Sequence, residues 1–144
     1  MTDSAAPDLS PYRGLAAFEE TDLDARLFFG RDRETEIVTA NLEASRLTVL
    51  YGASGVGKSS LLRAGVIHRL RAEGHSGAVR HVVAVCSSWR GDPLVVVAAA
   101  VADVLSDELG EPVVATPGRS LADELEVWCG RLDGEIYVVL DQLE

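Results

Sequence analysis

The order of hydrophobic and polar residues predicts helices at five places in the chain. The ranges are 16–25, 33–45, 58–72, 93–109 and 120–129. In the helix of residues 58–72, apolar side chains repeat at the spacing of one helix face, at Leu61, Leu62, Val66 and Leu70. In the second range, Asp32 is expected to cap the helix start, and Ile37, Val38 and Leu42 are expected to face inward.

Residues that commonly cap helices support the predicted starts and ends of the last three helices. Asp92 followed by Pro93 is typical of a helix start, and Gly110 is suited to end that helix. Ser120 and Asp123 resemble a capping box in front of the last helix. Gly74 is expected to end the helix of residues 58–72.

Three apolar runs predict strands between these helices, at residues 47–51, 79–86 and 136–140. From Val82 to Cys86 the second run has no polar alternation, as in a strand that is buried on both faces of a parallel sheet. Strands that alternate with helices favour such a sheet, covered on both faces. We therefore expect an α/β fold with three αβα layers.

A glycine-rich motif follows the first predicted strand and leads into a helix. It has the form Gly-x-x-x-x-Gly-Lys-Ser, the pattern of a phosphate-binding loop, or P-loop. Backbone N–H groups of such a loop converge on phosphates, the lysine reaches the β- and γ-phosphates, and the serine hydroxyl coordinates Mg²⁺. The residues expected to bind nucleotide here are Gly52, Ala53, Ser54, Gly55, Val56, Gly57, Lys58, Ser59 and Ser60.

Two observations support this interpretation. Average residue usage gives four matching positions by chance in about one chain of this length in 200. Lys58 is also the only lysine, while the other basic residues are arginine. A compact ammonium fits a tight phosphate cradle better than the broad, planar guanidinium does.

A second chemical position is Asp141, which ends the third predicted strand. After a P-loop, such an aspartate is expected to orient Mg²⁺, with the Ser59 hydroxyl on the other side of the ion. Glu144 lies three residues later and could polarise an attacking water. The candidate catalytic residues are therefore Lys58, Asp141 and Glu144, and the candidate metal ligands are Ser59 and Asp141.

Composition and charge limit the kinds of molecule that this chain is expected to bind. The net charge is −10, and the arginines are scattered, so direct nucleic-acid binding is not expected. The two cysteines and three histidines have no metal-ligand or redox spacing. The start of the chain lacks signal-peptide features, and the longest apolar run, residues 93–102, is too short to span a membrane. These features favour a cytoplasmic protein.

Several motifs together resemble the novel-STAND group of NTPases, the signal-transduction ATPases with numerous domains. They are Ser10-Pro11-Tyr12-Arg13-Gly14-Leu15, Phe28-Phe29-Gly30-Arg31-Asp32-Arg33-Glu34, the P-loop, and Asp141-Gln142-Leu143-Glu144. The resemblance extends from Ser10 to Glu144. The first two motifs are much more specific than the nucleotide motifs.

The resemblance implies an AAA-like P-loop fold that binds ATP or ADP with Mg²⁺. Phe29, Gly30 and Arg31 would lie against the adenine and ribose. Such proteins act as bacterial signalling or defence switches, some as nucleotide-dependent oligomers, and couple a sensor to an effector. Gln142 stands where many AAA-type ATPases have glutamate, which suits slow hydrolysis.

The resemblance also implies an incomplete domain. Residues 1–11 are expected to be a disordered lead-in, and residues 12–144 the N-terminal part of the NTPase domain, truncated after the Walker B strand. A strand that comes later in such proteins would separate the first and third predicted strands. Winged-helix, sensor and effector domains would be the missing partners, and the chain alone is expected to bind nucleotide weakly, to aggregate, or both.

Two other functions fit a P-loop. One is a small-molecule kinase or another metabolic NTPase. A GTPase would need a second lysine in its guanine-binding motif, and Lys58 is the only lysine. A kinase would be expected to have an arginine-rich lid after the last strand, and the sequence has none there. The other is a binding module that uses nucleotide structurally. Replacement of Glu144 would separate that module from an ATPase.

Overall fold

The structure is a computed structural model, and it describes residues 30–76 and 79–142. The chain divides into two compact units, Met1–His68 and Arg69–Glu144, and each is considered by itself. The predicted lead-in at residues 1–11 and the predicted helix at residues 16–25 lie outside the described residues.

The described part of the first unit is built on a contact between two helices. Helix α2 (Asp32–Ala44) packs against η1 (Leu61–Ile67), a π-helix that directly follows the short helix α3 (Lys58–Ser60). The contact is close because Gly65 lacks a side chain. A Cβ atom at that position would lie 2.5 Å from the Thr35 hydroxyl oxygen of α2.

The start of α2 differs from the prediction. Arg31, not Asp32, occupies the cap position, and no side chain caps the helix. Asp32 is the first helical residue, and its negative carboxylate there interacts favourably with the positive end of the helix dipole. Val38 is buried as expected, but the prediction for Ile37 is wrong, since its side chain is 51% exposed.

The prediction of a strand at residues 47–51 is also wrong. The structure has no strand there, although the segment carries apolar and β-branched side chains. Leu47, Val49 and Tyr51 are strongly exposed, while Thr48 and Leu50 are partly buried. Propensity favours an extended chain, but a strand also needs a neighbour that accepts and donates its backbone hydrogen bonds.

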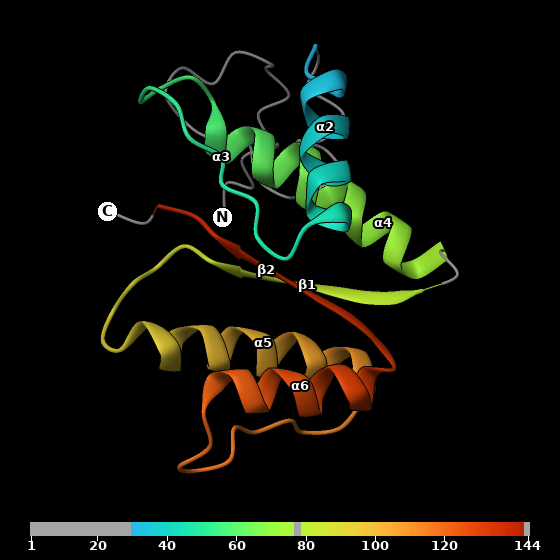
Figure 1. The fold of residues 1–144 in the computed structure, drawn as a ribbon, viewed down its shortest axis with the longest axis vertical. Coiled ribbons are helices and arrows are strands. Elements are labelled where there is room, and N and C mark those ends of the chain that lie inside the picture. The colour runs from blue at the N-terminus through green and yellow to red at the C-terminus, as the bar shows by residue number, and fades with distance from the viewer. Residues whose placement is uncertain (1–29, 77–78, 143–144) are drawn as a thin grey trace, which may run out of the picture. The chain divides into compact units, whose positions relative to one another are not determined.

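The second unit contains a two-stranded parallel sheet (Figure 1). Strand β1 (Arg80–Cys86) pairs with β2 (Gly134–Leu140), with Arg80 opposite Gly134 and Cys86 opposite Leu140. Helices α5 (Pro93–Leu109) and α6 (Leu121–Leu132) connect the strands and lie together on one face of the sheet. Helix α4 (His68–Ser76) precedes β1 and runs past Gly74, so this glycine does not end the helix as predicted.

The caps of α5 and α6 agree with the sequence. The Asp92 carboxylate accepts a hydrogen bond from the Leu94 N–H, and Gly110 ends α5 in the left-handed conformation. The Ser120 hydroxyl accepts from the Asp123 N–H at the start of α6. These bonds satisfy N–H groups that a helix start leaves without a partner inside the helix.

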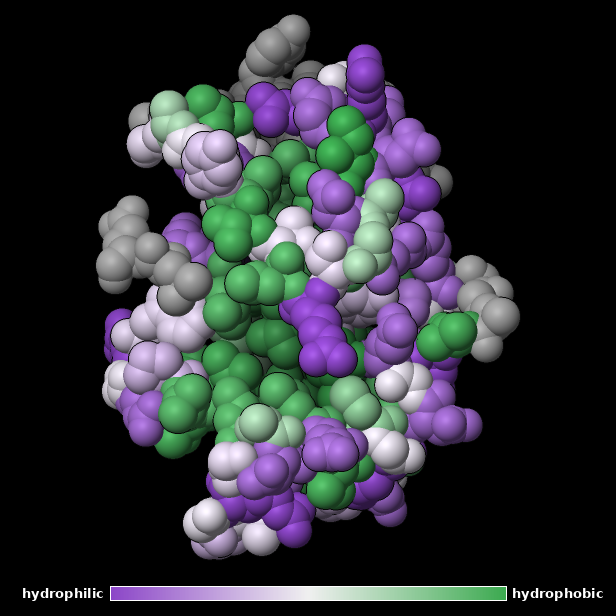
Figure 2. Space-filling view, in the orientation of Figure 1, coloured by the Kyte–Doolittle hydropathy of each residue, from purple (hydrophilic) through white to green (hydrophobic). Residues whose placement is uncertain are grey.

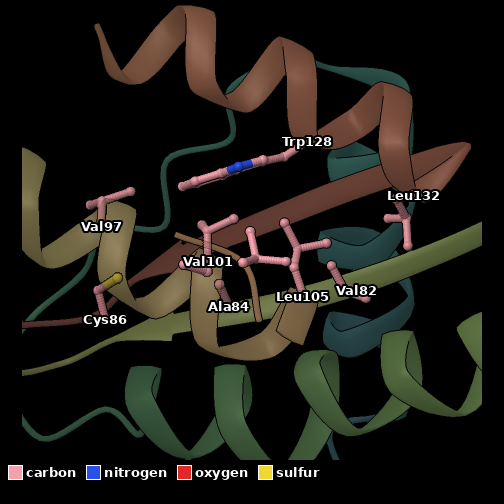
Figure 3. Close-up of a cluster of buried hydrophobic side chains, with 10 residues drawn as sticks. Val82, Ala84, Cys86, Val97, Val101, Leu105, Trp128 and Leu132 are labelled. Atoms are coloured by element: carbon pink, nitrogen blue, oxygen red, sulfur yellow. The ribbon is translucent and has the colours of Figure 1, made fainter. Parts of the chain in front are cut away.

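A hydrophobic cluster holds α5 and α6 on the sheet. The Trp128 ring projects from α6 toward Val97 and Val101 of α5, and Val82, Ala84 and Cys86 of β1 belong to the same cluster (Figure 3). The side chains of β1 that join it are alternate residues, as expected for one face of a strand. On the other face, the His81 Nε2 donates a 2.6 Å hydrogen bond to the Leu70 carbonyl oxygen of α4.

The described residues therefore confirm an α/β chain with a parallel sheet. They contain two of the three predicted strands and four of the five predicted helices. The three-layer P-loop arrangement and the truncation of the domain stay predictions.

Candidate functional site

The glycine-rich loop (residues 52–57) joins the extended segment to helix α3. Gly55 and Gly57 have φ angles of 79° and 82°, in the left-handed region that favours glycine. Gly57 then caps α3, so the chain passes from the loop directly into Lys58, Ser59 and Ser60. Ser60 is buried, whereas Lys58 and Ser59 are partly exposed.

The Lys58 side chain bends back over this loop. Its Nζ atom donates to the Gly52 carbonyl oxygen at 2.9 Å and to the Ala53 carbonyl oxygen at 2.8 Å. An ammonium has three N–H donors, and these bonds use two of them. The only positive side chain of the loop–helix junction is therefore fixed beside the loop backbone.

Arg31 contacts the same loop from the start of α2. Its Nη2 atom donates to the Val56 carbonyl oxygen at 2.9 Å, across 25 positions in the sequence. Gly30, just before it, has a φ angle of 82° and so turns the chain as few other residues could. The family resemblance implied a nucleotide-pocket role for Arg31, and the structure brings its guanidinium to the loop backbone.

A cavity of about 260 Å³ lies within the first unit. Its wall is mainly apolar, with one acidic and two basic side chains, a composition typical of small-ligand sites. The lining residues are Arg31, Glu34, Ile37, Val38, Leu50, Tyr51, Val56, Lys58 and Leu61. Lys58 and Val56 belong to both the cavity wall and the loop–helix junction.

Tyr51 is a lining residue of the cavity that was not predicted from the sequence. It is 88% exposed, although the sequence predicted that it would end a strand of the sheet. Other apolar side chains are also exposed on the protein, and Figure 2 shows hydrophobic side chains at the surface.

Asp141 belongs to the second unit, directly after β2, and is buried. Its backbone N–H donates to the Cys86 carbonyl oxygen at 2.8 Å, and its own carbonyl oxygen accepts a 2.9 Å hydrogen bond from the Trp89 Nε1. Trp89 was missed by sequence reasoning. The available signal was a large aromatic residue in the loop after a predicted strand.

The residues proposed for Mg²⁺ are one carboxylate, Asp141, and one hydroxyl, Ser59. Mg²⁺ prefers oxygen ligands and commonly takes only one or two from the protein, with phosphates and waters completing the shell. The described ranges contain no group of three or more acidic, histidine or cysteine side chains that could hold a metal ion. A carboxylate and a hydroxyl are oxygen donors of the kind that Mg²⁺ prefers, and Ser59 belongs to the first unit while Asp141 belongs to the second.

Two candidate residues, Phe29 and Glu144, lie outside the described residues. The structure brings Gly30, Arg31 and residues 52–60 into one unit and places Asp141 in the other. Among residues 30–76 and 79–142, no helix is long and apolar enough to cross a membrane.

One comparison with known proteins gave a match. The sequence model of a protein family described as Novel STAND NTPase 1 matches residues 11–144. No curated protein and no solved structure matches the chain significantly. The family match covers the glycine-rich loop, the Arg31 region and Asp141.

Proposed function

Because the chain belongs to the Novel STAND NTPase 1 family, we propose that its first unit binds ATP or ADP through the glycine-rich loop, Lys58 and the cavity beside them. The family assignment indicates a nucleotide-binding module. The assignment of individual residues, the metal and the switching role are parts of the proposal.

The conformation of the loop–helix junction carries the proposal. Left-handed Gly55 and Gly57 turn the chain just before the helix, as a loop whose N–H groups cradle a phosphate requires. The Nζ atom of Lys58 lies 2.8–2.9 Å from two carbonyl oxygens of the loop, so its charge is beside the loop in which we propose that a phosphate binds. Gly52, Ala53, Ser54, Val56, Ser59 and Ser60 complete this phosphate site.

The cavity supports binding of the base. A purine is flat and largely apolar on its faces, and the cavity offers Ile37, Val38, Leu50 and Leu61 as apolar lining. Its volume suits a base better than a whole nucleotide, so the phosphates would extend toward Lys58. Phe29, Gly30 and Arg31 are assigned to the base and ribose by their motif.

Mg²⁺ and hydrolysis are assigned from the order of the motifs in the chain. Ser59 and Asp141 would hold the ion, which would neutralise phosphate charge when bound. Glu144 would orient the attacking water. Gln142 next to Asp141 favours slow turnover, as in a bacterial signalling or defence switch that couples to further domains and assembles with other copies in the cytoplasm.

The family assignment favours this function over a small-molecule kinase. A kinase would have to bind a second substrate beside the nucleotide. The cavity of about 260 Å³ beside Lys58 is the site that we assign to the base.

The single lysine allows a direct test. Acetylation of Lys58 with a limiting amine reagent can be followed by mass spectrometry, with the N-terminal amine of the same chain as an internal reference. ADP with Mg²⁺ is expected to slow acetylation of Lys58 at least several-fold while the reference amine reacts at an unchanged rate. AMP should protect less because it lacks the β-phosphate that Lys58 would contact.

Two outcomes would contradict the proposal. Equal rates of Lys58 acetylation with and without ADP would exclude phosphate binding at this lysine. Equal protection by GDP and ADP would exclude the assignment of the cavity to adenine while leaving the phosphate site intact. Replacement of Lys58 by alanine should also lower ADP affinity by at least about tenfold, measured by calorimetry.

A further inference from the structure

The backbone of Asp141 is held from both sides by the segment that ends β1. Its N–H group donates to the Cys86 carbonyl oxygen at 2.8 Å, and its carbonyl oxygen accepts from the Trp89 Nε1 at 2.9 Å. A residue with both peptide groups fixed has a fixed direction for its Cα–Cβ bond. The direction of the Asp141 Cα–Cβ bond, which carries the carboxylate, is therefore tied to the position of the Trp89 ring.

The chain needs this support because the sheet ends here. The pairing of β1 with β2 stops at Cys86 and Leu140, and Gln142 has a φ angle of 57°, in the left-handed region. A residue other than glycine is uncommon in that conformation and turns the chain away from the strand direction. The Asp141 carbonyl oxygen thus lies beyond the regular ladder, and the indole of Trp89 supplies its donor.

Trp89 is well placed to act as a fixed donor. Its partly buried ring packs against the hydrophobic cluster of the second unit. The loop that carries it begins at Cys86, whose carbonyl oxygen binds Asp141, and ends at Asp92, which caps α5. Packing and two anchored loop ends restrict the ring, so the hydrogen bond costs little additional ordering.

We propose that Trp89 is a positioning residue for the metal-binding carboxylate of Asp141. The ring does not contact the ion. It fixes the Asp141 backbone, and with it the Cβ position from which the carboxylate would bind Mg²⁺. This inference rests on the proposed role of Asp141 in binding Mg²⁺, and the test separates the two.

The measurement is the gain in ADP affinity that Mg²⁺ produces, taken as the ratio of dissociation constants in EDTA and in excess Mg²⁺. Trp89→Phe keeps an aromatic ring in the cluster and removes the N–H donor. The gain is expected to fall by about tenfold, as for other residues that orient a metal ligand, while the affinity for ADP in EDTA stays the same. A purely structural hydrogen bond would lower the unfolding midpoint and leave the gain unchanged.

The chain contains a matched control, because Trp128 is its only other tryptophan. Trp128 lies in the same cluster on α6 and is almost completely buried. Trp128→Phe should lower the unfolding midpoint at least as much as Trp89→Phe does. Its Mg²⁺-dependent gain in ADP affinity should equal that of the unchanged chain.

Asp141→Asn separates the inference from its premise. If this variant loses the gain and Trp89→Phe keeps it, Trp89 does not position the carboxylate, although the proposed function stands. If Asp141→Asn keeps the gain, the metal assignment of Asp141 fails, and the role of Trp89 fails with it. Loss of the gain in both variants and its retention in Trp128→Phe would support the proposal.

A spectroscopic measurement covers the case in which Trp89→Phe does not fold. In the Trp128→Phe variant, Trp89 is the sole source of tryptophan fluorescence. Addition of Mg²⁺ to the complex with ADP is expected to shift the wavelength of Trp89 emission. Binding of the ion by Asp141 would change the hydrogen bond that the indole donates to this residue. An unchanged emission spectrum at saturating Mg²⁺ would overturn the proposal.

Discussion

The Arg31 Nη2 donates to the Val56 carbonyl oxygen at 2.9 Å, so the start of helix α2 is bonded to the glycine-rich loop. The bond joins a motif that precedes α2 to a loop 25 positions away in the sequence. Arg31 therefore makes a contact that its motif did not suggest, and we expect this bond to restrict the motion of the loop.

Loss of this bond should loosen the loop. Arg31→Gln is expected to raise amide hydrogen exchange in a peptide that covers residues 52–57, measured without nucleotide. ADP affinity should fall about two- to tenfold, corresponding to ~0.5–1.5 kcal/mol for one exposed hydrogen bond. Arg33→Gln changes the same charge at an exposed position of α2 and should leave exchange in the loop unchanged. Equal exchange in the two variants would contradict this role for Arg31.

Gly65 is expected to reverse the usual effect of a glycine-to-alanine change in a helix. Alanine normally stabilises a helix by about 1 kcal/mol relative to glycine. At Gly65, however, a Cβ atom would lie 2.5 Å from the Oγ1 of Thr35, a buried residue of the neighbouring helix α2. We expect Gly65→Ala to lower the free energy of unfolding by about 1–3 kcal/mol in urea titrations.

Two variants check this explanation. A Cβ atom at Gly130 of α6 would have no neighbouring atom within 4 Å, so Gly130→Ala should raise the free energy of unfolding or leave it unchanged. Thr35→Ala removes the clashing hydroxyl, and the double variant with Gly65→Ala should be more stable than the sum of the two single changes predicts. Additive effects would show that the clash is not the cause.

Glu124 should make stability depend on pH in the acid range. Its carboxylate is buried in the second unit and accepts a 2.6 Å hydrogen bond from the Thr116 N–H. Hydrogen bonds from Thr116, and to a smaller extent the charge of Arg119, hold the pKa of Glu124 below its usual value, against the opposing effects of burial and Asp123.

The sign follows from the lowered pKa. The carboxylate stabilises the folded state above the pKa of an unfolded glutamate, about 4.3, and this contribution is lost as the pH falls through the lower pKa of the folded state. Glu124→Gln should therefore lower the urea midpoint at neutral pH and remove part of its decline in acid. Glu126→Gln, at an exposed position of the same helix, should change neither.

Trp128 is expected to be the most sensitive position of the second unit. Its side chain is 1% exposed and packs among residues of both strands and α5. Trp128→Ala should lower the free energy of unfolding by about 3–5 kcal/mol, through lost burial and the cavity that remains. Val127→Ala, at an exposed neighbouring position, should cost less than about 1 kcal/mol. Similar urea midpoints for the two variants would contradict this assignment of the core.

Local rules predicted most of the second unit. Asp92, Gly110 and Ser120 cap their helices through short-range contacts, and the unbroken apolar run from Val82 to Cys86 forms a strand. These features depend on neighbours in the sequence, which is why a single sequence contains them.

The failures depend on distant partners. The segment from Leu47 to Tyr51 has strand-forming residues, but no neighbouring strand in the described structure accepts its hydrogen bonds. The bonds of Arg31 to Val56 and of Trp89 to Asp141 connect residues 25 and 52 positions apart. No periodicity or capping rule reports such pairs. The glycine-rich loop, Arg31 and Asp141 were therefore found from their motifs, whereas the bonds of Arg31 to Val56 and of Trp89 to Asp141 were not predicted.

The π-helix η1 has a consequence for the directions of its own side chains. Its backbone pairs residues five apart, whereas an α-helix pairs residues four apart. A π-helix therefore brings a different side chain back to the same face than an α-helix of the same sequence would. The seven residues 61–67 thus determine which of their own side chains face α2, and Gly65 lies there beside Thr35.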